Sequence, residues 1–124
     1  MAKVLVVEDY ASLQKIYKTA LAMQGHVVDV ANNGDEALDY TGKKEYDVIL
    51  LDMLMPQTDG LSFLKIFSVR HRDAKTKIIA FSNLTTSELA SEARELGVSK
   101  YLAKPALTPK QVAAEIDAVL KDSN

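Results

Sequence analysis

Short apolar runs alternate with stretches of helical periodicity along the whole chain. Five of these runs are predicted to be strands, at residues 4–7, 27–30, 48–51, 78–81 and 101–103. Most of them are apolar at every position, which is typical of parallel strands covered by helices on both faces. Asp29 gives the second run an alternating pattern, so we expect that strand to be the more exposed one.

Apolar residues in three of the intervals follow the i, i+3, i+4, i+7 spacing of one buried helix face. These residues are Leu13, Ile16, Tyr17, Ala20 and Leu21; Leu61, Leu64 and Phe67; and Val112, Ile116, Val119 and Leu120. Residues 35–41 predict a shorter helix. A fourth interval is mostly polar or small and has only Leu89, Ala93 and Leu96 as an apolar seam, so the helix there should be easily displaced.

Capping signals mark several helix boundaries. They are Thr85 with Glu88 and Thr108 with Gln111, spaced as capping boxes, and Gly25 and Gly97, which follow helices where a left-handed residue is favoured. The strict alternation of five strands and five helices predicts one α/β domain with a parallel sheet and right-handed crossovers.

Composition excludes several classes of protein. Fifteen Lys and Arg against seventeen Asp and Glu give a net charge of −2, which provides no bulk attraction to nucleic acid or to an anionic membrane. The absence of cysteine excludes disulfides, thiolate zinc sites and cysteine nucleophiles. The apolar runs are too short to span a membrane, and no secretion signal opens the chain. These features predict a small, soluble domain of the cytoplasm.

Polar residues with complementary chemistry stand at the carboxyl ends of the predicted strands, where open α/β sheets bind ligands. Glu8 and Asp9 follow the first strand, Asp52 the third, Ser82 the fourth and Lys104 the fifth. Three clustered carboxylates would repel one another, and a hard dication such as Mg²⁺ relieves that repulsion. The hydroxyl and the lysine would then contact the oxygens of a phosphoryl group.

Four motifs at characteristic spacings carry a family resemblance. They are Val6-Val7-Glu8-Asp9, Asp52 within the segment 50–60, Ser82, and Tyr101-Leu102-Ala103-Lys104-Pro105. With them the chain resembles the receiver domain of bacterial two-component response regulators over essentially its whole length. The resemblance implies a flavodoxin-like, doubly wound (βα)5 fold with strand order 2-1-3-4-5, and a single receiver domain over residues 1–124.

The resemblance also implies a phosphoacceptor site. Asp52 would accept a phosphoryl group from a histidine kinase or a phosphotransfer protein, with Mg²⁺ as cofactor. Asp52 and Asp9 would bind the metal directly, Glu8 through a water molecule and Leu54 through its backbone carbonyl. An aspartate is ionised near neutral pH, so the attack needs no general base.

The switch is implied by the same resemblance. Ser82 and Lys104 would hold the phosphoryl oxygens, Tyr101 would be the aromatic switch residue, and Pro105 would follow a cis peptide bond. Phosphorylation would alter the surface of the fourth helix, fifth strand and fifth helix for a downstream protein target. We expect no contact with nucleic acid or membrane, and either a monomer or a phosphorylation-dependent dimer.

Alternative functions fit less well. A phosphatase with an aspartyl-phosphate intermediate needs a second acid two residues after the nucleophile, where this chain has Leu54. No Ser/Thr-rich flavin loop and no P-loop follows the first strand, and the acids and lysine argue against a scaffold that is not phosphorylated. The chain is expected to be either a complete single-domain regulator or the receiver of a larger regulator with an output domain. His26 and His71 are predicted to be exposed surface residues, and the basic residues around position 70 a solvated face.

Five positions depart from the common receiver pattern. They are Leu54, Asn83, Ala106, Gln14 and Thr58. None of them removes a predicted ligand of the metal or the phosphoryl group, so we expect the site to be competent. Leu54 and Leu84 cannot orient a hydrolytic water, which predicts slow self-dephosphorylation, whereas the amide of Asn83 is the one nearby group that could replace the missing polar side chain. The chain is not expected to be an enzyme beyond these reactions on its own aspartate.

Overall fold

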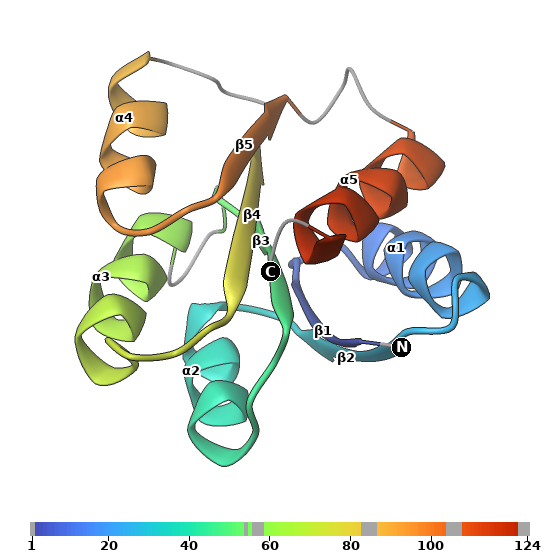
Figure 1. Cartoon of the computed structure of the whole chain (residues 1–124), viewed down its shortest axis with the longest axis horizontal. Coiled ribbons are helices and arrows are strands. Elements are labelled where there is room, and N and C mark those ends of the chain that lie inside the picture. The colour runs from blue at the N-terminus through green and yellow to red at the C-terminus, as the bar shows by residue number, and fades with distance from the viewer. Residues whose placement is uncertain (1, 54, 56–58, 83–86, 104–107, 122–124) are drawn as a thin grey trace.

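Strands and helices alternate along the part of the chain that the structure describes (Figure 1). The structure is a computed structural model, and it describes residues 2–53, 55, 59–82, 87–103 and 108–121. The strands are β1 (Lys3–Val7), β2 (Val27–Ala31), β3 (Val48–Asp52), β4 (Lys77–Ser82) and β5 (Lys100–Ala103). The helices are α1 (Ala11–Met23), α2 (Gly34–Lys43), α3 (Gly60–Arg70), α4 (Ser87–Glu95) and α5 (Pro109–Lys121).

The five strands form one parallel sheet in the order β2-β1-β3-β4-β5. This confirms the flavodoxin-like, doubly wound fold and the strand order predicted from the sequence. After β1 the chain forms β2 at one edge of the sheet, and β3 then pairs with the opposite side of β1. The direction in which successive strands are added therefore reverses between β1 and β3. Asp29 lies on the edge strand β2 and is partly exposed, as its alternating pattern predicted.

Helices cover both faces of the sheet, with α1 and α5 on one face and α2, α3 and α4 on the other (Figure 1). Successive side chains of a strand point to opposite faces, so each strand contributes to two separate cores. In β3, Val48 and Leu50 belong to the core beneath α1 and α5. Ile49 and Leu51 belong to the core beneath the other three helices.

The apolar stripe of α1 is narrower than its sequence pattern predicted. Tyr17 and Leu21 are buried, and the ring of Tyr17 packs edge-on against Phe81 with the centroids 5.4 Å apart. Ile16 was predicted to be buried, but it is 43% exposed. It lies at the margin of the stripe, where the side chain reaches solvent.

The helix boundaries largely follow the predicted signals. Thr108 and Gln111 form a reciprocal capping box, with hydrogen bonds of 2.8 and 3.2 Å between side chain and backbone. Gly25 and Gly97 have φ values of +88° and +101°, as expected for left-handed residues after a helix. Thr85, of the other predicted box, lies outside the described residues.

The apolar contact of α4 with the rest of the molecule is small. Ala93 is the one residue of this helix that is fully buried, and Leu89 and Leu96 are partly buried beside it. The thin seam predicted from the sequence is therefore confirmed. Displacing a helix held in this way exposes little apolar area, so it costs less than displacing α3 or α5.

Neither histidine is the exposed surface residue that the sequence predicted. The side chain of His26 is only 6% exposed and lies beside Asp117. The ring of His71 stacks on Phe67, with the centroids 4.8 Å apart, and is partly buried. Asp117 is distant from His26 in the sequence, and Phe67 lies one helical turn before His71. The residues next to each histidine, a turn in one case and a basic cluster in the other, do not reveal these partners.

Candidate functional site

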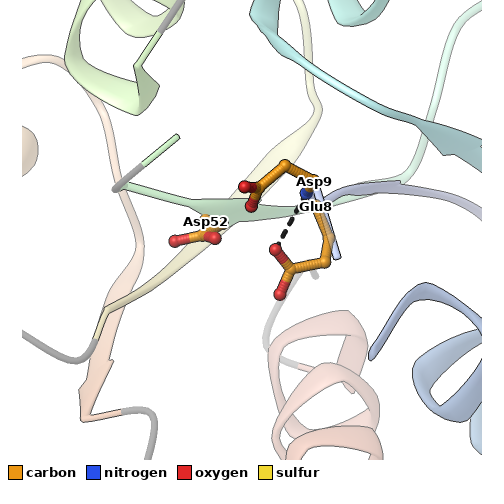
Figure 2. Close-up of side chains that lie close together, drawn as sticks. All are labelled: Glu8, Asp9 and Asp52. Carbon is orange, nitrogen blue, oxygen red and sulfur yellow. Dashed lines mark hydrogen bonds between the residues drawn. The ribbon is translucent and has the colours of Figure 1, made fainter. Parts of the chain in front are cut away.

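The carboxyl ends of the central strands bring the predicted acids together. Glu8 and Asp9 follow β1, and Asp52 is the last residue of β3, which pairs directly with β1. One carboxylate oxygen from each of the three residues lies within 4.8 Å of the other two, and Figure 2 shows the three side chains gathered at the ends of the two strands. The site lies where the strand order reverses, the usual ligand position in such sheets.

Burial of the acids differs within the cluster. Glu8 is 0% exposed and Asp52 is 2% exposed, whereas Asp9 is only partly buried. Ionised groups at such depth are costly unless positive charge or hydrogen-bond donors compensate them. A bound cation would therefore stabilise the two buried carboxylates.

The donor set fits Mg²⁺. Ligand oxygens lie about 2.1 Å from this ion, so two oxygens on opposite sides of it are about 4 Å apart. One oxygen from each of the three carboxylates lies within 4.8 Å of the other two, close to the spacing that ligands of one such ion require. Glu8, Asp9 and Asp52 could therefore hold the ion together with water molecules. Leu54, the predicted carbonyl ligand, lies outside the described residues.

The peptide group between Glu8 and Asp9 is held from both sides. Its N–H donates to Oε2 of Glu8 at 2.9 Å, which Figure 2 shows as a dashed line. Its carbonyl oxygen accepts a hydrogen bond from Nε2 of Gln14 at 2.5 Å. The N–H of Tyr10 also lies 3.5 Å from the same carboxylate oxygen of Glu8. This bonding sets the directions in which the two acidic side chains leave the backbone.

Gly60 brings the start of α3 against the end of β3. Its N–H donates to the carbonyl of Met53 at 3.2 Å. A Cβ atom at position 60 would lie 2.7 Å from Cα of Met53 and 2.9 Å from the backbone oxygen of Asp52. Asp59 caps the helix by accepting from the N–H of Ser62 at 2.8 Å. The backbone that carries Asp52 is thus held by a contact that only glycine permits.

Ser82 and Tyr101 extend the site along the neighbouring strands. Ser82, the last residue of β4, is fully buried. Burial raises the pKa of the Tyr101 hydroxyl, a hydrogen bond with Ser82 opposes this, and the charge of Asp52 raises the pKa further. The Tyr101 hydroxyl therefore interacts with Ser82 through a hydrogen bond and with Asp52 through its charge. Lys104 and Pro105, predicted to complete this side of the site, lie outside the described residues.

Gln14 is the site-related residue whose role the sequence did not reveal. The sequence marks it only as a departure from the family pattern, but its side chain contacts the backbone of Glu8 and the side chain of Asn32. One signal was available. Gln14 stands beside Leu13 and three residues before Tyr17, so it is a polar residue next to the buried stripe of its helix.

Comparison with known proteins gives a consistent result. Residues 4–117 match the family described as the response regulator receiver domain. The probable transcriptional regulator ycf27 of Guillardia theta is 38% identical over 98% of this chain and 46% of its own length. The transcriptional regulatory protein ResD of Bacillus subtilis is 33% identical over 96% of this chain and 48% of its own. The chain thus spans about half the length of these relatives.

Solved structures of similar proteins share the whole fold. The receiver domain of the Francisella response regulator 1452 superposes with a TM-score of 0.88 at 32% identity and covers all of both chains. The chemotaxis protein CheY4 of Vibrio cholerae gives a TM-score of 0.88 at 31% identity, over 96% of this chain and 98% of its own.

Among the residues that the structure describes, no helix is long and apolar enough to cross a membrane.

Proposed function

The chain belongs to the response regulator receiver domain family, and from this premise we propose that Asp52 is its phosphoacceptor. The observation that carries the proposal is the cluster of Glu8, Asp9 and Asp52 at the strand-order reversal, where one carboxylate oxygen of each lies within 4.8 Å of the other two. In the proposed reaction the bond between phosphorus and the nitrogen of a phosphohistidine breaks. A bond between phosphorus and a carboxylate oxygen of Asp52 forms, and the histidine nitrogen leaves with the electron pair.

The residues around Asp52 have separate tasks in this proposal. Glu8 and Asp9 hold Mg²⁺, which neutralises charge on the phosphoryl oxygens when it is bound. Ser82 donates its hydroxyl to one of these oxygens, and Lys104 pairs with another. Phosphoryl transfer depends mainly on positioning and electrostatic stabilisation, so this set needs no strong base.

The switch is proposed to act on one face of the sheet. Ala80 of β4 faces the core beneath α4, and the alternation of β4 places Ser82 on the same side. Tyr101 packs against that core, which also contains Ala93 of α4. A phosphoryl group that draws Ser82 inward would therefore pull on Tyr101 and shift α4, whose apolar contact is small. Helix α4 with β5 and α5 is the surface that a downstream protein would read.

The proposed partners follow from this role. A histidine kinase or a phosphotransfer protein supplies the phosphoryl group, and a protein target reads the altered surface. The domain is placed in the cytoplasm, as predicted from its composition. The relatives ycf27 and ResD are described as transcriptional regulators of about twice this length. A role as the receiver of a larger regulator therefore stands beside that of a single-domain regulator.

Labelling by a small phosphodonor tests the proposal. Incubation with acetyl phosphate and Mg²⁺ should add the mass of one phosphoryl group, and peptide mapping should place it on Asp52. Asp52→Asn should abolish the addition, whereas Asp39→Asn, an exposed aspartate of α2, should leave it unchanged. Stoichiometric labelling of the Asp52→Asn protein would refute the assignment.

A further inference from the structure

Gln14 links two loops beside the acidic cluster. Its Nε2 atom donates to the backbone oxygen of Glu8 at 2.5 Å and to Oδ1 of Asn32 at 2.7 Å. A carboxamide nitrogen carries two hydrogens, so each acceptor receives its own. The opposite orientation of the amide would place an oxygen against two acceptors, so these contacts fix which end of Gln14 faces the site.

The contacts continue from Asn32 into the first turn of α2. The Nδ2 and backbone N–H groups of Asn32 both donate to Oε1 of Glu36, at 2.9 and 3.1 Å. The backbone N–H of Glu36 in turn donates to Oδ1 of Asn33, the N-cap of the helix, at 2.9 Å. Because the Nδ2 group of Asn32 donates to Glu36, the other end of its amide, Oδ1, faces Gln14 and accepts from it. The chain of bonds thus joins α1, the end of β1 and the start of α2.

We propose that Gln14 is a positioning residue for the metal ligands, and this inference rests on the proposed function. The carbonyl that it holds belongs to the peptide group between Glu8 and Asp9, whose N–H is held by the carboxylate of Glu8. Rotation of this peptide plane would swing both acidic side chains. Gln14 fixes the plane from outside the cluster, without adding charge to it.

Gln14→Met tests the inference because methionine keeps the length of the side chain and removes both donors. We expect the affinity for Mg²⁺, titrated in the unphosphorylated protein, to fall about 5-fold, and the amide hydrogens of Asp9 and Tyr10 to exchange faster. The rate of labelling by acetyl phosphate should fall at low Mg²⁺ and recover at saturating Mg²⁺. Lys15→Met places the same residue one position along the helix at an exposed site and should change none of these quantities.

Asn32→Ala provides a second variant, because it removes one acceptor of Gln14 and leaves the bond to Glu8. Its loss of Mg²⁺ affinity should be smaller and in the same direction, and it carries the test if Gln14→Met does not fold. A Gln14→Met protein that loses stability in urea but keeps the wild-type Mg²⁺ affinity and amide exchange would overturn the inference. Failure of the wild-type protein itself to bind Mg²⁺ or to be labelled would instead refute the proposed function.

Discussion

The Nε2 atom of His26 lies 2.8 Å from Oδ1 of Asp117, 91 residues further along the chain. The other ring nitrogen, Nδ1, accepts a hydrogen bond from the backbone N–H of Ala2 at 3.1 Å. Because Nδ1 is an acceptor there, the hydrogen of the neutral ring lies on Nε2 and is donated to Asp117. One side chain thus joins the residue before β1, the residue before β2 and helix α5.

Removal of this ring should destabilise the fold. We expect His26→Leu to lower the free energy of unfolding by about 2 kcal/mol, because a backbone donor and a carboxylate both lose their partner. Asp117→Asn retains an acceptor oxygen and should cost less. Urea unfolding measures both. His71→Leu is the control, since the ring of His71 stacks on Phe67 and leucine keeps an apolar contact there. Equal stability of His26→Leu and the wild-type protein would contradict the expected role.

The contact between Asp29 and Tyr46 predicts a pH dependence of stability. The Tyr46 hydroxyl donates to Oδ2 of Asp29 at 2.7 Å, and Lys44 lies 2.9 Å from the same oxygen. The hydrogen bond from Tyr46 is the largest of the effects that hold the pKa of Asp29 below its model-compound value of 3.8. Since the folded pKa is depressed, this contribution is complete above pH 3.8 and is lost as the pH falls through the folded value.

Tyr46→Phe should therefore destabilise the protein by about 1.5 kcal/mol at pH 7, and by less below pH 3.8, where the contribution of the ionised Asp29 declines as the pH falls toward its folded pKa. Burial raises the pKa of Tyr46 above its usual 10.0, so its contribution persists through neutral pH and is lost only in strong alkali. Urea unfolding at pH 7 and at pH 3 measures the difference. Tyr40→Phe, at a more exposed tyrosine, should show little effect. A destabilisation by Tyr46→Phe that did not change between the two pH values would argue against the ionic contact.

Substitution by alanine should change the stability of the protein in opposite directions at two glycines that lie in helices. Gly60→Ala places a Cβ 2.7 Å from Cα of Met53, so the backbone at the end of β3 must shift, at a cost of about 2 kcal/mol. Labelling of Asp52 should slow as well, because its backbone oxygen is also in contact. Gly42→Ala meets nothing within 4 Å and lies in α2, so it should stabilise the protein by about 0.5 kcal/mol. Equal effects of the two substitutions would show that the close approach of α3 is not required.

The two acids after β1 should contribute unequally to metal affinity. We expect Asp9→Asn to weaken Mg²⁺ binding more than Glu8→Gln, because Asp9 is proposed as a direct ligand and Glu8 as a ligand through water. For the wild-type protein the affinity should fall as the pH falls, since protonated carboxylates do not bind the ion. Titration of each variant at neutral pH provides the comparison. Equal losses would remove the distinction between the two roles.

The phosphorylated state should be long-lived. Leu54 and Leu84, which lie outside the described residues, are predicted to flank the mouth of the site and to exclude the hydrolytic water. Leu54→Asn should restore a hydrogen-bonding side chain and accelerate the decay of phosphorylated protein several-fold. A wild-type protein that decays as fast as this variant would contradict the prediction. Slower decay of Asn83→Ala would identify Asn83 as the residue that orients the water.

The periodicity of the chain was sufficient to predict a parallel sheet covered by helices on both faces, and the family resemblance implied the order of its strands. The cluster of acids followed from the rule that parallel strands end at one edge of the sheet. The partners of His26 and Gln14 could not be predicted in this way. Asp117 and Asn32 are 91 and 18 residues away from them, and hydrogen bonds over such separations leave no periodic signal. Ile16 fits the regular apolar pattern of its helix and is nevertheless 43% exposed. The width of the buried face therefore depends on tertiary packing, which the pattern does not predict.

The sheet divides the interior into two cores that share the backbone of the strands. Val48 and Leu50 belong to the same core, so substitutions at these two positions should be energetically coupled. Pairs on opposite faces, such as Leu50 and Leu51, direct their side chains into different cores. In evolutionary terms, the core beneath α1 and α5 can accumulate compensating substitutions while the core beneath α4 keeps its own side chains and packing. A lineage of such proteins can therefore repack one core while the packing of the other is retained.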